Sequence, residues 1–227
     1  MDQTQKTIGQ PVTRLKFCGF TRQEDVAQAI AVGADALGFV FYPKSRRYVS
    51  PQQARELTAN LPPFVTTVAL FVEPEPEFVQ EVIEQMHPGL LQFHGDESPQ
   101  MCQQFDWPYL KAFRVGAPGL ETGSEIEQFC LQYPKASGWL FDSFTPAYGG
   151  SGHAFDQNLL MQVAQNPEAR PLILSGGLQA DTVGGFIEQL RPWAVDVSSG
   201  IEDSPGVKSA QKMQRFASAV HQASMRL

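Results

Sequence analysis

The chain has 227 residues, of which 42% are hydrophobic and 18% charged, with a formal net charge of -7 at pH 7. These proportions are typical of a globular protein and exclude extensive disorder, and the acidic balance without clusters of Lys or Arg argues against nucleic acid as the main partner. The three cysteines, Cys18, Cys102 and Cys130, lie too far apart for a metal-ligand motif, and a disulfide scaffold is not expected in a chain of this length.

The first segment, from Met1 to Pro11, is polar and lacks the apolar core of a signal peptide. No apolar stretch anywhere in the chain reaches the roughly 18 residues that a membrane helix needs. We therefore expect a cytoplasmic protein without membrane contact. Residues 1–12 are predicted to be a flexible extension, and residues 13–227 a single catalytic domain.

Eight short apolar runs recur along the chain, and most are followed by a polar stretch with helical periodicity. The runs are Leu15–Cys18, Ala36–Phe41, Val65–Val72, Leu90–Phe93, Tyr109–Phe113, Trp139–Phe141, Leu172–Leu174 and Ala194–Val197. One run falls about every 28 residues, which is the spacing that eight βα units in a compact barrel require. Several runs are apolar at consecutive positions, as parallel strands buried on both faces are. The pattern predicts an α/β fold, a single (β/α)8 TIM barrel.

Caps and apolar stripes locate several helices between these runs. Ser50-Pro51-Gln52-Gln53 supplies a cap, a proline at the first helical position and a capping-box glutamine, and Ser98-Pro99 repeats the first two features. Residues Glu77–Met86 carry an apolar helical face. A last helix is predicted from the stripe Val207, Ala210, Met213, Phe216, Ala217 and Val220.

The main rival architecture is a doubly wound open sheet, which has the same alternation of strands and helices. Such a fold often carries a G-x-G-x-x-G fingerprint for a dinucleotide after its first strand. The first turn here reads Cys18-Gly19-Phe20-Thr21 and lacks that fingerprint. The sequence therefore favours the barrel.

Catalytic groups of such barrels lie at the carboxyl ends of the strands and in the loops that follow. The polar residues there are Cys18, the Arg46-Arg47 pair, His94, Asp142, Ser175 and Asp196. Four of them have a structural alternative. A buried cysteine often acts as a small hydrophobe, Asp142 could cap a loop, His94 could orient one, and Asp196 could serve a purely structural partner.

Two glycine-containing turns indicate a phosphate site. The seventh run leads into Ser175-Gly176-Gly177-Leu178 and the eighth into Ser198-Ser199-Gly200-Ile201-Glu202. Glycine lets backbone N–H groups approach an anion, and barrel enzymes often bind phosphate in these two loops, although both could be simple tight turns. A third glycine-rich segment, Tyr148–His153, is either a mobile cover over the site or an irregular loop without a role.

The most informative segments are Lys16–Thr21, Gly38–Val49, Gln92–Gly95, Lys111–Arg114, Phe141–Ser143, Gly149–Gly152, Ser175–Leu178 and Val195–Glu202. In this order and spacing they resemble the phosphoribosylanthranilate isomerase family of tryptophan biosynthesis, from about Leu15 to Ala219. There are departures. Arg46 stands where the family pattern has proline, and Gln157 where it has tryptophan.

The resemblance implies an Amadori rearrangement of N-(5-phosphoribosyl)anthranilate to 1-(2-carboxyphenylamino)-1-deoxyribulose 5-phosphate, by an isomerase without metal or cofactor. One acid must open the sugar ring and one base must remove a proton from the neighbouring carbon. The resemblance assigns Cys18 as general base and Asp142 as general acid. It implies that Arg47, His94 and Asp196 contact the substrate. The two glycine-containing turns predict that the phosphate is bound by Gly176, Gly177, Ser199 and Gly200.

Two alternative functions stay open. Another phosphosugar barrel of the epimerase or synthase type would need several metal-binding His and Asp residues or a catalytic lysine. The sequence offers only His94 for the first and the Lys16 and Lys111 positions for the second. A non-catalytic barrel that binds a phosphometabolite would not need both Cys18 and Asp142. The expected partner is a small phosphorylated molecule, and the protein is expected to be a monomer or a homodimer.

Overall fold

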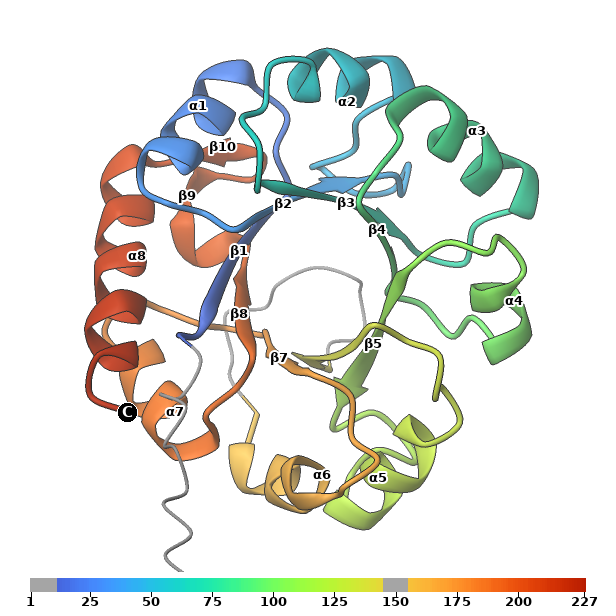
Figure 1. Cartoon of the computed structure of the whole chain (residues 1–227), viewed down its shortest axis with the longest axis vertical. Coiled ribbons are helices and arrows are strands. Elements are labelled where there is room, and N and C mark those ends of the chain that lie inside the picture. The colour runs from blue at the N-terminus through green and yellow to red at the C-terminus, as the bar shows by residue number, and fades with distance from the viewer. Residues whose placement is uncertain (1–11, 145–154) are drawn as a thin grey trace, which may run out of the picture.

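The computed structural model describes residues 12–144 and 155–227. Eight parallel strands, β1 to β8, form a closed barrel in which each strand pairs with the next and β8 pairs with β1. Helices surround the ring of strands (Figure 1). The predicted (β/α)8 barrel is confirmed. The proposed boundary between an extension, 1–12, and the domain stays a prediction, since residues 1–11 lie outside the described residues.

All eight apolar runs coincide with strands. The strands are β1 (Arg14–Cys18), β2 (Ala36–Val40), β3 (Thr66–Phe71), β4 (Leu90–Phe93), β5 (Tyr109–Val115), β6 (Gly138–Ser143), β7 (Leu172–Leu174) and β8 (Ala194–Val197), followed by the antiparallel pair β9 (Glu202–Ser204) and β10 (Val207–Lys208). The helices are α1 (Gln23–Ala31), α2 (Pro51–Thr58), α3 (Pro76–Met86), α4 (Pro99–Gln103), α5 (Gly123–Cys130), α6 (Met161–Gln165), α7 (Val183–Leu190) and α8 (Ala210–Ser224), with the 3₁₀ turns η1 (Gln157–Leu160) and η2 (Ser199–Ile201).

Alternate residues of each strand point to opposite faces, and the two faces are filled differently. The outer face carries phenylalanines that pack on one another and on the helices, as Phe71 does on Phe93 and Phe17 does on Phe216 of α8. Burial of each such ring contributes roughly 1.5–3 kcal/mol. The inner face carries small and aliphatic side chains, which form a separate cluster of Val68, Leu110, Ala112, Leu140, Ile173 and Ala194. The barrel interior is thus a packed core below the site.

The predicted helix starts are confirmed at two caps. Ser50 forms the complete capping box with Gln53, and the Ser98 hydroxyl accepts from the amide of Met101. One prediction is wrong in part: the last helix begins at Ala210, and Val207 belongs to β10 instead. Val207 is apolar at the expected helical spacing, but it pairs with Ser204 in the short β9–β10 hairpin, which the sequence did not predict.

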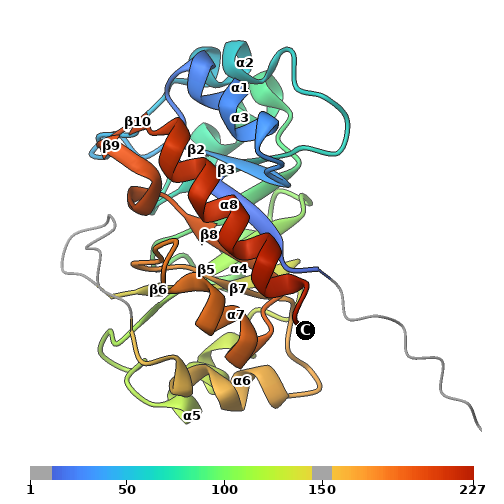
Figure 2. The same ribbon diagram turned by 90° about the vertical axis from the view of Figure 1, so that its left-hand side faces the viewer.

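The β9–β10 hairpin connects the last barrel strand to α8. Figure 2 shows α8 crossing the outside of the barrel, with the hairpin beyond its first turn. The hairpin also contacts the loop between β1 and α1, where the Thr21 hydroxyl donates to the carbonyl of Gly206 at 2.6 Å. Across residues 12–144 and 155–227, no helix combines the length and hydropathy that a membrane crossing requires.

Candidate active site

A pocket at the carboxyl ends of the strands gathers the predicted site residues. Its lining includes Cys18, Arg47, His94, Asp142, Gly176, Gly177, Asp196, Ser199 and Gly200, which are all of them. Strand alternation explains this meeting, since Cys18, Asp142 and Asp196 occupy inward positions at the ends of β1, β6 and β8. Arg46 is exposed and absent from the lining, so of the two adjacent arginines only Arg47 faces the pocket. The segment Tyr148–His153 lies outside the described residues.

Cys18 lies at the end of β1 with its side chain almost fully buried. A side chain on Gly38 of β2 would place its Cβ 2.6 Å from the Cys18 sulfur, so the glycine leaves room for the thiol. Burial raises the pKa of Cys18 above the usual thiol value, although the charges of Lys16 and Lys208 oppose the shift. Cys18 is therefore a thiol in the free protein at neutral pH.

Asp196 meets its hydrogen-bonding requirement inside the barrel. Its Oδ1 accepts from the Lys16 ammonium at 2.8 Å, and both side chains are about 95% buried. Burial alone would lower the pKa of Lys16, but the neighbouring Asp196 and Cys18 raise it above its usual value. Lys16 thus stays charged beneath the pocket and holds Asp196 in place, while Asp196 itself lines the cavity.

The two carboxyl oxygens of Asp142 have different partners. Its Oδ1 accepts from the amide of Ser143 at 2.8 Å, and its Oδ2 lies 3.0 Å from His94 Nε2. The other ring nitrogen of His94, Nδ1, lies 2.9 Å from Gln92 Nε2, while Gln92 Oε1 is buried without a partner in the described part of the chain. A neutral imidazole donates from one ring nitrogen and accepts at the other, so the orientation of the Gln92 amide and the His94 tautomer together decide whether Asp142 accepts or donates this bond.

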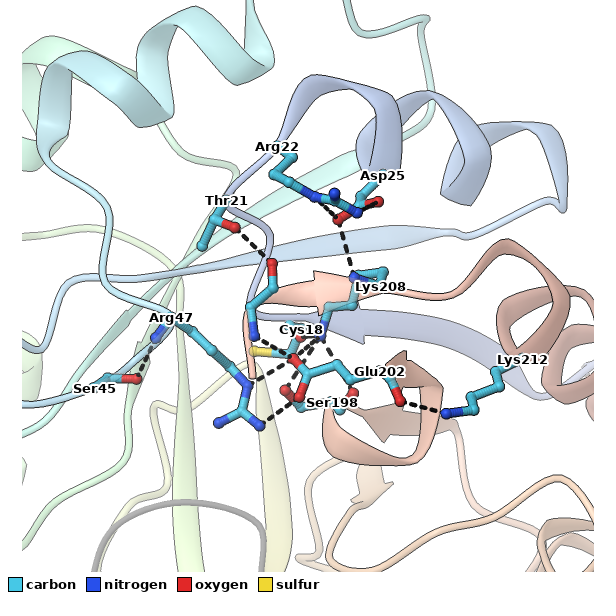
Figure 3. A network of polar contacts seen from close by, with 11 residues as sticks. Cys18, Thr21, Arg22, Asp25, Ser45, Arg47, Ser198, Glu202, Lys208 and Lys212 are labelled. Atoms are coloured by element: carbon cyan, nitrogen blue, oxygen red, sulfur yellow. Dashed lines mark hydrogen bonds and ion pairs between the residues drawn. The ribbon is translucent and has the colours of Figure 1, made fainter. Parts of the chain in front are cut away.

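Arg47 forms a bidentate ion pair with Glu202 at the start of β9 (Figure 3). Lys208 of β10 contacts the same carboxylate at 2.8 Å. Sequence reasoning missed the roles of Glu202 and Lys208, and also that of Gln92. In the sequence Glu202 is only part of a loop motif, and no local pattern connects it to an arginine 155 residues earlier.

The two glycine-containing loops interlock above the barrel. Gly176 and Gly177 have φ angles of +80° and +64°, which favour glycine. A Cβ on Gly176 would lie 2.5 Å from the amide nitrogen of Ser143, and one on Gly200 would lie 2.3 Å from the carbonyl oxygen of Leu178. A side chain at Gly200 would therefore force the two loops apart, and one at Gly176 would push its loop away from the end of β6.

The remaining candidates for acid or metal chemistry lie elsewhere. Lys111 of β5 faces outward, where its ammonium donates to the carbonyl of Gly95 at 2.6 Å and to Glu97 at 3.0 Å. The Lys16 ammonium is paired with the Asp196 carboxylate below the pocket. Among the described residues, no group of three or more His, Cys, Asp or Glu side chains is arranged to hold a metal ion.

Known proteins resemble this chain over nearly its whole length. Residues 15–219 match the family model described as N-(5'-phosphoribosyl)anthranilate (PRA) isomerase. The enzyme of that name from Bordetella petrii is 55% identical over 215 residues, which are 95% of this chain and 98% of the relative. The structure of phosphoribosyl anthranilate isomerase from Thermotoga maritima is similar with a TM-score of 0.83 at 40% identity, covering 92% of this chain and 98% of that one. Another isomerase structure, in complex with reduced 1-(o-carboxyphenylamino)-1-deoxyribulose 5-phosphate, has a TM-score of 0.79 at 36% identity, with coverage of 92% and 98%.

Proposed function

The chain belongs to the N-(5'-phosphoribosyl)anthranilate isomerase family, and on that premise we propose how its pocket performs the isomerisation in tryptophan biosynthesis. The substrate is N-(5-phosphoribosyl)anthranilate, and the product is 1-(2-carboxyphenylamino)-1-deoxyribulose 5-phosphate. The observation that carries the proposal is the shared pocket, where a thiol from β1 and a carboxyl group from β6 face one cavity beside an arginine and two glycine loops.

The reaction requires two proton transfers on the sugar. Asp142 in its protonated form donates to the ring oxygen, the bond between that oxygen and C1 breaks, and the anthranilate nitrogen forms an iminium with C1. The Cys18 thiolate then removes the proton from C2, which gives an enolamine that tautomerises to the ketone. An acid and a base each contribute typically 10²–10⁴-fold. No step consumes an oxidant or a reductant, because the product is an isomer of the substrate.

The contact between Asp142 and His94 supports the role of the acid. When His94 carries its proton on Nδ1, its bare Nε2 accepts from a protonated Asp142 and keeps the proton at Oδ2. That tautomer requires Gln92 to turn its amide oxygen toward Nδ1, and that oxygen has no other partner in residues 12–144 and 155–227. After transfer to the sugar, the imidazole in its other tautomer can donate to the carboxylate. Gln92 and His94 thus accommodate both protonation states of the acid.

The two ends of the substrate fit opposite sides of the pocket. We place the phosphate on the backbone N–H groups of Gly176, Gly177, Ser199 and Gly200, which all line the pocket. The anthranilate carboxylate then extends across the mouth toward the loop after β2. There Arg47 faces the cavity, and a guanidinium pairs bidentately with a carboxylate. His94 and Asp196 complete the wall around the sugar.

Complementation tests the proposed activity in a cell. The coding sequence should restore growth without tryptophan to a bacterial strain that lacks its own isomerase gene, while the Asp142→Asn variant should not. Equal soluble expression of both proteins serves as the control. Failure of the wild-type chain to restore growth, despite normal expression, would contradict the proposal.

A further inference from the structure

Glu202 has more polar contacts than a simple ion pair requires. Its Oε1 accepts from Arg47 Nε at 2.8 Å, from Lys208 Nζ at 2.8 Å and from the amide of Gly206 at 3.2 Å, while Oε2 accepts from Arg47 Nη2 at 2.6 Å. The side chain is only 4% exposed. Burial acts to raise the pKa of Glu202, but Arg47 and Lys208 bring it below its usual value. Glu202 is therefore an ionised carboxylate, saturated by fixed donors.

Arg47 is held along one edge and leaves another edge for a ligand. A guanidinium has five N–H groups, and the pair with Glu202 uses the edge formed by Nε and Nη2. The terminal edge, Nη1 with the second hydrogen of Nη2, can receive a second carboxylate. Figure 3 shows the other terminal nitrogen pointing away from Glu202. The stem of Arg47 crosses Gly19, where a Cβ would lie 2.5 Å from Arg47 Cδ.

Lys208 anchors the opposite side of this carboxylate. Its ammonium donates to Glu202 Oε1 and to the backbone carbonyls of Cys18 and Ser198. These three acceptors match the three N–H groups of the charged form, and the Ser198 hydroxyl lies slightly farther away at 3.4 Å. Burial lowers the pKa of Lys208, and Glu202 counters the shift. The same side chain thus connects Glu202 to the backbone beside the proposed base and to the loop proposed for the phosphate.

The cluster carries one more positive than negative charge. Arg47 and Lys208 share a single carboxylate, and no other carboxylate contacts either side chain in the described ranges. Without Lys208, the charges of Arg47 and Glu202 would sum to zero, and the attraction of an approaching anion would be weaker. With Lys208 bound behind Glu202, the exposed guanidinium edge keeps a net positive field toward the pocket.

We propose that Glu202 is a positioning residue that fixes Arg47 so that its terminal edge meets the substrate carboxylate, and that it thereby sets the preference for a carboxylated aromatic amine. The proposal rests on the proposed function, in which Arg47 binds that carboxylate. A fixed arginine loses less rotamer freedom on binding, and the resulting gain in affinity is roughly threefold to tenfold. A ligand without the carboxyl group gains nothing from the arrangement.

Two ligands isolate this effect. One is reduced 1-(o-carboxyphenylamino)-1-deoxyribulose 5-phosphate, and the other is its phenylamino analogue without the carboxyl group. The ratio of their dissociation constants measures the contribution of the carboxylate alone. Arg47→Ala should bring the ratio close to one. Glu202→Gln, which keeps the shape but turns an N–H group toward Arg47, should lower the ratio by roughly threefold to tenfold, while the affinity for the phenylamino analogue changes by less than about twofold.

Controls separate the possible failures. Asp203→Asn removes an exposed partner of Lys212 next to Glu202 and should leave the ratio unchanged. Should Glu202→Gln fail to fold, Glu202→Asp retains the charge, withdraws it by one methylene and should also lower the ratio. In the double variant with Arg47→Ala, the Glu202 substitution should have no further effect on the ratio.

The outcomes are distinguishable. A ratio that falls in Arg47→Ala but not in either Glu202 variant would overturn the positioning role and leave Arg47 as the carboxylate site. Equal weakening of both ligands by Glu202→Gln would also overturn it, because a merely structural role does not discriminate between them. A ratio unaffected by Arg47→Ala would instead contradict the carboxylate site of the proposed function.

Discussion

The surroundings of Cys18 act in opposite directions on its pKa, and hence on its proposed role as base. Burial disfavours the thiolate, whereas Lys16 below it and Lys208 beside it favour the thiolate. The position of Cys18 at the end of a strand was predictable from sequence, because strand alternation and the barrel rule place such residues in the mouth. Its charged neighbours were not predictable, since Lys208 follows it by 190 residues and carries no local signal.

The pH dependence of thiolate formation at Cys18 follows from this environment. Because burial raises the pKa of Cys18, the thiolate fraction is small at neutral pH and grows as the pH rises. The rate at which a small haloacetamide alkylates Cys18, which requires only the thiolate, should therefore increase about tenfold per pH unit below the thiol pKa, and the rise should continue beyond the ordinary thiol value of about 8.5. Alkylation kinetics followed by mass spectrometry across this pH range measures the slope.

Cys18→Ser is the control for that profile. It should fold normally, lose the pH-dependent alkylation at this position and lose most of the activity, because a hydroxyl is a far poorer base than a thiolate. A variant with near-wild-type turnover would return Cys18 to a packing role.

The Asp142→Asn variant tests whether Asp142 is the general acid. The amide keeps the shape and the contacts with Ser143 and His94 but has no acidic proton for the sugar oxygen. We expect kcat to fall by roughly 10²–10⁴-fold, with ligand affinity little changed. Binding of the reduced product analogue is measured alongside turnover. Activity within about tenfold of wild type would mean that the acid lies elsewhere.

Loops position the groups that bind the two ends of the substrate. The strands and the capped helices were predictable, because apolar runs and Ser-Pro starts are local signals. The β9–β10 hairpin was not predictable. Its residues are few and polar, and Val207 continues the apolar spacing of α8, so the periodicity extends past the true helix start at Ala210. Hairpin pairing depends on contacts with Thr21, Asp25 and Arg47, far away in sequence.

The loop after β2 yields a prediction about which of its two adjacent arginines binds the substrate. Arg47 faces the pocket and Arg46 faces solvent. Arg47→Ala should raise KM roughly tenfold to a hundredfold, as expected for the loss of one charged hydrogen-bonded contact. Arg46→Ala should change KM by less than about twofold. The reverse pattern would show that the neighbouring arginine binds the carboxylate.

The loop after β8 is tested at Gly200. A Cβ there would lie 2.3 Å from the carbonyl oxygen of Leu178, so Gly200→Ala must separate the two loops proposed to hold the phosphate. We expect KM to rise about tenfold, equivalent to roughly 1.4 kcal/mol of binding. Gly185→Ala in α7 is the matched control, since its Cβ meets nothing within 4 Å and alanine favours a helix. Equal KM values for the two variants would argue against a phosphate site between these loops.

Across the whole molecule, the residues that stabilise the barrel are separate from those proposed to bind and convert the substrate. The phenylalanines outside the strands and the aliphatic cluster within them form the core, while the carboxyl ends of the strands carry the polar groups. This division was predictable, because eight apolar runs at this spacing, without a dinucleotide fingerprint after the first, favour a closed barrel and locate its mouth. The buried ion pairs between distant strands, such as Lys16 with Asp196, were not, because pairing partners in space have no fixed spacing in sequence.

Turnover of N-(5-phosphoribosyl)anthranilate tests the central claim most directly. The purified protein, treated exhaustively with a chelator, is mixed with freshly prepared substrate, and the loss of its anthranilate fluorescence is followed over time. We predict rapid loss with the wild-type protein and a rate reduced by roughly 10²-fold or more in Cys18→Ser and Asp142→Asn. A wild-type rate equal to that of buffer alone, or one restored only by a divalent cation, would contradict the account.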